Sequence, residues 1–101
     1  VSGERISPIE VESALMHHNS VREAAVIGVP DKIKGNILKA FVVVIPNTEK
    51  TPELKQELMQ YVKQNYAGHA YPKIIEFRDK LPKTNSGKII RMKLREEENK
   101  K

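Results

Sequence analysis

One lysine in this sequence stands in a setting suited to chemistry. Lys88 follows Ser86 and Gly87, within a stretch that runs from Leu81 to Arg91. A glycine directly before the lysine allows a positive φ and a close approach of the backbone to a ligand. The ammonium group supplies a compact charge for a phosphate or carboxylate oxygen. The residues alone also fit a solvated surface lysine, because most lysines are exposed, so both interpretations stay open at this point.

Three other patterns do not support a site. A P-loop needs a glycine where Pro82 stands and a Ser or Thr where Ile89 stands. The neighbouring His17 and His18 would point about 100° apart on a helix, and nothing completes a set of metal ligands, so we expect no metal site. His69 has no evident base or nucleophile as a partner, so a catalytic triad is not predicted.

The charge balance favours an anionic partner. In 101 residues, 18 Lys and Arg against 13 Asp and Glu give a net charge of +5. The aromatic residues are scattered rather than spaced as a stacking platform, so we do not expect nucleic-acid binding. The basic residues of the loops would instead form a rim for a phosphorylated small molecule. These residues are Lys32, Lys34, Lys73, Lys83, Lys88 and Arg91.

The composition also limits the compartment and the domain count. The chain has no cysteine, which excludes disulfide and thiolate chemistry and fits a cytoplasmic location. No apolar run approaches the roughly 20 residues that a membrane-spanning helix needs. The length fits a single domain, residues 1–101. Because the sequence opens at Val1 without a methionine, we interpret it as a piece of something larger.

Two helices have clear start signals. Ser7, Pro8 and Glu10 predict a capped helix that runs to about His18, with Asn19 ending it in a left-handed conformation. Its expected buried face consists of Val11, Ala14, Leu15 and His18. The run Thr51-Pro52-Glu53 repeats the signal for a second helix that ends at Gly68. Its expected apolar face consists of Leu54, Leu58, Tyr61, Val62 and Tyr66.

The remaining elements are strands and a basic tail. Residues 24–29 and 37–45 are apolar runs joined by a short linker, which predicts an antiparallel hairpin. Residues 73–78 predict a third strand. A short helix should follow Lys88, and residues 96–101 should be solvated and frayed. The expected fold class is therefore α+β, with a small three-stranded sheet flanked by helices and a short N-terminal hairpin-like segment.

Three blocks of sequence together resemble a known family. Residues 2–12 are similar to a Gly-Tyr-Arg-Ile-x-Pro-x-Glu-hydrophobic-Glu segment, and residues 24–29, Gly35 and residues 39–43 match the strands that follow it. Residues 85–91 resemble the terminal motif of the same family. The family is the C-terminal domain of adenylate-forming, AMP-forming acyl-CoA synthetases of the medium-chain acyl-CoA and acetyl-CoA type, which are relatives of luciferases.

The resemblance implies roles for particular residues. Lys88 would contact the carboxylate and the α-phosphate during adenylation, with Gly87 and Arg5 also near the adenylate. An ammonium group at this place would offset the negative charge that develops as a carboxylate attacks a phosphate. The resemblance also implies contacts to coenzyme A by Ser2, Gly3, Glu4, Lys34, Lys63, Tyr71, Pro72 and Lys73.

The same resemblance implies partners that lie outside this chain. A larger N-terminal adenylating domain would bind ATP and a small-molecule carboxylic acid, and the small domain would rotate between two half-reactions. Mg²⁺ is expected in the full-length enzyme but not on this domain, and the isolated domain should be inactive. Lys88 also resembles lysines that an acetyltransferase and a deacetylase modify reversibly. A free-standing basic module that binds a phosphorylated ligand or partner remains the alternative.

Overall fold

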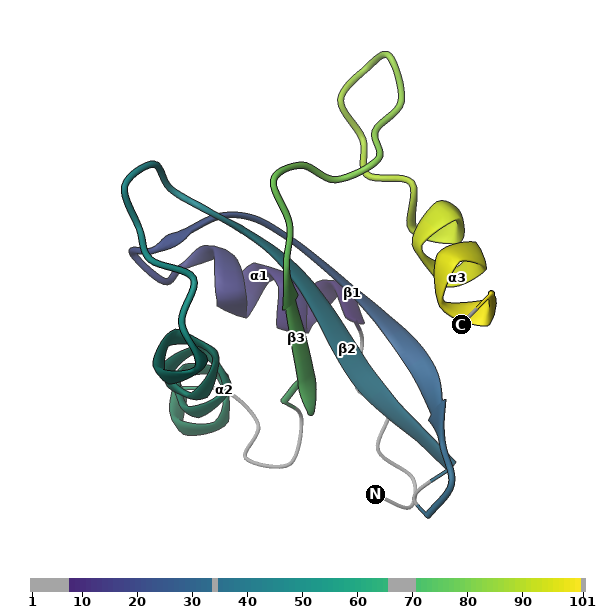
Figure 1. The fold of residues 1–101 in the computed structure, drawn as a ribbon, viewed down its shortest axis with the longest axis horizontal. Coiled ribbons are helices and arrows are strands. Elements are labelled where there is room, and N and C mark those ends of the chain that lie inside the picture. The colour runs from purple at the N-terminus through teal and green to yellow at the C-terminus, as the bar shows by residue number, and fades with distance from the viewer. Residues whose placement is uncertain (1–7, 34, 66–70, 101) are drawn as a thin grey trace.

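The part of the chain that the computed structural model describes forms six regular elements (Figure 1). The structure describes residues 8–33, 35–65 and 71–100. The elements in chain order are α1 (Pro8–Met16), β1 (Val21–Asp31), β2 (Gly35–Val44), α2 (Pro52–Asn65), β3 (Ile74–Phe77) and α3 (Arg91–Asn99). The predicted α+β class is therefore confirmed. The expected cap at Ser7 and the expected end of the second helix at Tyr66 to Gly68 lie outside the described residues.

The three strands form a mixed sheet in the order β1-β2-β3. Strands β1 and β2 pair in antiparallel register, which confirms the predicted hairpin, and β3 adds to β2 in parallel. The hairpin is longer than predicted, because β1 already begins at Val21 and continues through Pro30, which pairs with Asn36. Within sheets, proline is confined mainly to edge strands, and β1 is an outer strand of this order.

Both faces of the sheet are covered. Ala24 and Val26 of β1 belong to a core cluster with residues of α1 and α2, whereas Ala25 and Ile27 belong to a second cluster with Leu94 of α3. The alternation follows from the two-residue period of a strand. Because both faces of the sheet are buried, the strand sequences are continuous apolar runs and do not alternate between apolar and polar residues.

The end of α1 differs from the prediction. The helix ends at Met16, and Asn19 does not take a left-handed conformation. Instead, the N–H of His18 donates to the carbonyl of Leu15 at 3.0 Å, and the Nδ1 of His18 accepts the N–H of Ser20 at 3.0 Å. Such tight bonds satisfy the groups at a helix end, so no left-handed residue is needed before β1.

Helix α2 begins as predicted. The Oγ1 of Thr51 accepts the N–H of Leu54 at 3.1 Å, which is the bond expected of an N-cap residue, and Pro52 occupies the first helical position. Leu54, Leu58 and Val62 are buried on the face that packs against the sheet.

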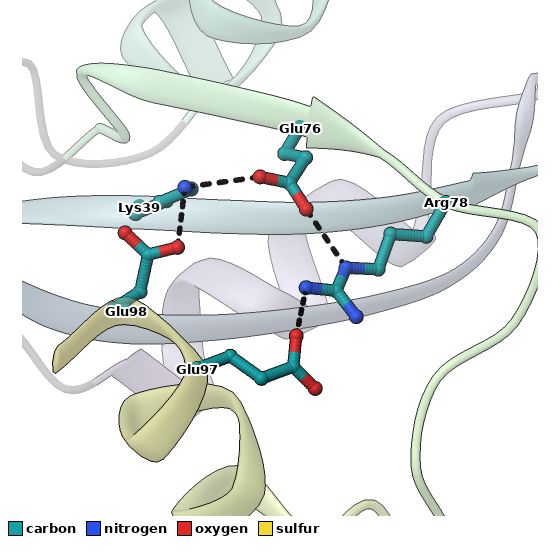
Figure 2. Close-up of polar contacts among 5 residues, drawn as sticks. All are labelled: Lys39, Glu76, Arg78, Glu97 and Glu98. Atoms are coloured by element: carbon teal, nitrogen blue, oxygen red, sulfur yellow. Dashed lines mark hydrogen bonds and ion pairs between the residues drawn. The ribbon is translucent and has the colours of Figure 1, made fainter. Parts of the chain in front are cut away.

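Glu96 and Glu97 of the tail are exposed, as expected, but the prediction that the tail frays was wrong. Helix α3 continues to Asn99, and its end is tied to the sheet by ion pairs (Figure 2). The Nζ of Lys39 lies 2.7 Å from Glu98 of α3 and 3.1 Å from Glu76 of β3. Arg78 bonds to Glu97 of α3 and, at 2.8 Å, to Glu76. Pattern reasoning treated these glutamates as solvated because their partners are far away in the sequence.

Candidate functional site at the Lys88 hairpin

Lys88 lies in a hairpin that connects β3 to α3. Lys83 and Ile89 pair as an antiparallel bridge, and the N–H of Ile90 donates to the carbonyl of Pro82 at 2.9 Å. These contacts close the base of the hairpin. In Figure 1 the light green loop extends well beyond the sheet and the helices. The fold therefore places Lys88 on a hairpin that projects from the domain.

Hydrogen bonds define the tip of the hairpin. The N–H of Thr84 donates to the carbonyl of Lys88 at 2.8 Å, and the N–H of Gly87 donates to the carbonyl of Thr84 at 3.0 Å. Gly87 has a φ of 88°, which confirms the predicted positive φ. This is the arrangement of a three-residue hairpin loop whose last residue is left-handed. The glycine thus serves a defined turn that sets the direction of the following lysine.

The Lys88 side chain differs from the other cations near it. Lys88 is exposed, and no side-chain partner for its Nζ is found among the described residues. By contrast, Lys83 pairs with Glu23, and the Nε of Arg91 lies 2.6 Å from the carboxylate of Glu12. Two members of the expected basic rim are thus neutralised within the domain, whereas the Lys88 ammonium is presented outward.

Sequence reasoning missed the role of Glu12. This residue of α1 is buried and accepts the N–H of Val26 at 2.8 Å in addition to its bonds with Arg91. The hydrogen bond that Arg91 donates to Glu12 raises the pKa of the Arg91 guanidinium above its ordinary value. Glu12 therefore joins α1, β1 and the start of α3 at the base of the hairpin. The sequence held one signal of this role: Glu12 is a charged residue that stands between Val11 and Ala14, two residues of the expected buried face.

A second group of predicted site residues also comes together. The Nζ of Lys63 in α2 lies 5.3 Å from the ring centre of Tyr71, and the Nζ of Lys73 lies 4.1 Å from the same ring. The Nζ of Lys73 also donates to the Tyr71 hydroxyl at 2.6 Å. Pro72 between them is buried. Two ammonium groups beside one aromatic ring provide a positive surface for an anionic ligand.

The two groups lie at opposite ends of the domain. Residues 71–73 directly precede β3, and β3 starts at the end of the sheet that is remote from the Lys88 hairpin (Figure 1). The other predicted site residues lie outside the described residues: Ser2, Gly3, Glu4, Arg5 and Lys34.

The histidines of the described residues make structural contacts. His18 pairs with Glu57 and packs edge-on against Tyr61, and the Nδ1 of His17 lies 2.7 Å from the carbonyl of Ser13. Within residues 8–33, 35–65 and 71–100, no group of three or more metal-ligating side chains could hold an ion. None of the helices in these ranges is long and apolar enough to cross a membrane.

The turn at Gly87 leads to a stability prediction. We expect Gly87→Ala to lower the free energy of unfolding by about 1 kcal/mol, because an L-residue is disfavoured at a φ of 88°. An added Cβ would meet no atom of the described structure within 4 Å, so the cost comes from the backbone. Gly28→Ala in β1 is the matched control: its added Cβ is equally unobstructed, and Gly28 is not left-handed. Urea unfolding of both variants checks this, and an equal effect would contradict it.

Known proteins match this chain over most of its length. The family described as "AMP-binding enzyme C-terminal domain" matches residues 10–88, a stretch that ends at the candidate lysine. The acetyl-coenzyme A synthetase of Bacillus subtilis (strain 168) is 52% identical over 94 residues, which are 93% of this chain and 16% of that synthetase.

Solved structures agree as well. The crystal structure of Brucella canis acyl-CoA synthetase has a TM-score of 0.93 and 54% identity, and the match covers 98% of this chain and 18% of that one. The anthranilate CoA ligase AuaEII, solved in complex with anthranoyl-AMP, has a TM-score of 0.87 and 40% identity over 96% of this chain and 19% of its own. This chain spans less than a fifth of each relative. The chain belongs to the family of AMP-binding enzyme C-terminal domains, which confirms the resemblance seen in its sequence.

Proposed function

We propose that this chain is the C-terminal part of an ATP-dependent, AMP-forming carboxylic acid–CoA ligase. The observation that carries the proposal is the outward-facing Lys88 ammonium at the tip of a hydrogen-bonded hairpin, in a chain whose relatives are acyl-CoA and acetyl-CoA synthetases. The pocket for the acid and for ATP would lie in an N-terminal adenylating domain beyond this chain. The small share of each relative that the chain covers supports this division.

In the first half-reaction, a carboxylate oxygen attacks the α-phosphate of ATP. A new O–P bond forms, the bond to the bridging oxygen breaks, and pyrophosphate leaves with the electron pair. Two anions meet in this step, so a preorganised positive charge stabilises the transition state more than the separated reactants. Lys88 supplies that charge in our proposal, with Gly87 and Arg5 beside the adenylate. Mg²⁺ would accompany ATP and would not be held by this domain.

In the second half-reaction, the thiol of coenzyme A attacks the acyl carbon, and AMP leaves. The pair of ammonium groups beside Tyr71 is suited to the phosphates of the coenzyme, and we assign this contact to Lys63 and Lys73. Pro72 lies between Tyr71 and Lys73, and Ser2, Gly3, Glu4 and Lys34 complete the proposed set. Since this surface and the Lys88 hairpin lie at opposite ends of the domain, each would face one active site only in its own orientation. This separation supports a rotation of the domain between the half-reactions.

The alternative, a free-standing basic binding module, is not favoured. The relatives of this chain by sequence and by structure are acyl-CoA synthetases. In addition, two residues of the expected basic rim, Lys83 and Arg91, are already paired with glutamates of the same domain. A cytoplasmic location and reversible acetylation of Lys88 remain part of the proposal. Acetylation would remove the charge that adenylation requires, and mass spectrometry of the protein from its native source would detect it.

The products of the full-length enzyme test the proposed function. We expect incubation with ATP, coenzyme A and a panel of carboxylic acids to yield AMP, pyrophosphate and an acyl thioester in equal amounts for at least one acid. Without coenzyme A, the reaction should stop at enzyme-bound acyl adenylate. Release of ADP and phosphate, or tight retention of a phosphorylated ligand without consumption of ATP, would refute the proposal.

A further inference from the structure

We propose that Thr84 is a positioning residue for Lys88, because its hydroxyl holds the Lys88 backbone at the tip of the hairpin. This inference rests on the proposed role of Lys88 in adenylate formation. It assigns a function to a side chain that neither the basic pattern nor the match to the family explains.

The conformation of Gly87 creates the need for such a contact. In an ordinary antiparallel pair, two residues exchange both of their N–H to carbonyl bonds. Thr84 and Lys88 form one of these, from the Thr84 N–H to the Lys88 carbonyl at 2.8 Å. The carbonyl of Thr84, however, accepts the N–H of the left-handed Gly87 at 3.0 Å. The Lys88 N–H therefore turns to the Thr84 side chain.

The hydroxyl of Thr84 takes the place of that backbone carbonyl. Its Oγ1 accepts the N–H of Lys88 at 3.1 Å and lies 3.0 Å from the hydroxyl of Ser86. A hydroxyl offers one donor and two acceptor positions, so Thr84 can accept from Lys88 and donate to Ser86 at the same time. The side chain thus cross-links both sides of the turn, immediately before the lysine.

The position of the hairpin makes this contact important. The contacts at the base involve Lys83, Ile89, Ile90 and Pro82, whereas the Thr84 bonds are the ones that define the tip. Because the Nζ of Lys88 has no side-chain partner in the described part of the chain, the backbone of Lys88 is what fixes the point from which its flexible side chain extends. A displacement of about 1 Å in a reacting group can lower a rate about 100-fold.

Two substitutions at this position separate the hydroxyl from the shape of the side chain. Thr84→Val keeps the shape and loses the hydroxyl, and Thr84→Ser keeps the hydroxyl. In the full-length enzyme, we expect Thr84→Val to lower kcat for adenylate formation about tenfold, as the loss of one hydrogen bond suggests, with a nearly unchanged KM for ATP. Thr84→Ser should remain close to the wild type. Thioester formation from a supplied acyl adenylate should be unchanged in both.

Thr51→Val is the matched control for loss of a threonine hydroxyl. Its Oγ1 accepts the N–H of Leu54 at 3.1 Å, the same length as the bond in the hairpin, but at the start of α2. We expect this variant to unfold at a lower urea concentration and to keep the ratio of the two half-reaction rates. A similar selective loss in Thr51→Val would show that general destabilisation causes the effect, and would overturn the inference.

The double variant distinguishes positioning from direct contact with a ligand. If Thr84 acts through Lys88, adding Thr84→Val to Lys88→Ala should cause no further loss of adenylate formation. A further tenfold loss would show that the hydroxyl touches a substrate itself, which contradicts the inference.

The single variants separate this inference from the proposed function. Unchanged adenylate formation in Lys88→Ala would refute the function of Lys88. A selective loss in Lys88→Ala together with wild-type rates in Thr84→Val would refute only the role of Thr84. Equal impairment in Thr84→Val and Thr84→Ser would also refute it, because Ser keeps the hydroxyl.

Discussion

Lys88→Ala in the full-length enzyme is expected to lower the rate of adenylate formation by about 100- to 1000-fold, the range seen when one preorganised charge-stabilising donor is removed. Thioester formation from a supplied acyl adenylate should remain within a few-fold of the wild type, because the lysine would be turned away from the active site in that step. The rate of pyrophosphate release measures the first half-reaction. The rate at which the free thiol of coenzyme A disappears measures the second.

Lys83→Ala is the control for this prediction. Lys83 lies on the same hairpin but pairs with Glu23, so its loss should change adenylate formation by less than about fivefold, the range of an exposed ion pair. Lys88→Arg should recover part of the activity, since the charge is kept while the shape and the reach of the group differ. Equal loss of both half-reactions in Lys88→Ala would contradict the assigned role.

The second large effect is expected at the ion-pair network of Figure 2. We predict that Lys39→Ala lowers the free energy of unfolding by about 3 kcal/mol, as is typical when one member of a buried ion pair is removed. The Lys39 side chain is only 7% exposed, and its ammonium group lies between the carboxylates of Glu76 and Glu98. Its Nζ also lies 5.1 Å from the ring centre of Phe41. Urea unfolding of the 101-residue chain measures the loss.

Lys50→Ala provides the matched comparison. Lys50 forms an ion pair of the same length, 2.7 Å, with Asp79, but the two side chains are 43% and 91% exposed. An exposed pair contributes little, because solvent screens it, so Lys50→Ala should change the free energy of unfolding much less than Lys39→Ala does. Comparing the stability losses of the two variants therefore separates the effect of burial from the effect of ion-pair length. If Lys39→Ala and Lys50→Ala had equal effects, the network would not be needed to hold α3 against the sheet.

Much of the fold could be predicted because it depends on neighbouring residues. The cap at Thr51, the hairpin of β1 and β2 and the positive φ of Gly87 all follow from local hydrogen bonds and backbone sterics. These are interactions that a short segment can make by itself, so a pattern of residue types identifies them.

Other features could not be predicted because distant segments must first meet. The end of α1 was misjudged because the following strand begins earlier than its apolar run suggests. The tail was predicted to fray because a run of glutamates is typical of a solvated end. In the folded domain these glutamates meet cations of β2 and of the segment after β3 instead.

The sequence by itself determined which segments form helices and strands, the turn at Gly87 and the family to which the chain belongs. The tertiary structure alone decided which charges are paired. Arg91 reaches Glu12 across 79 residues and Lys83 reaches Glu23 across 60, whereas Lys88 remains directed outward. The physical reason is that an ion pair depends on the distance between two groups in space, and for segments so far apart that distance is set by packing on the two faces of the sheet.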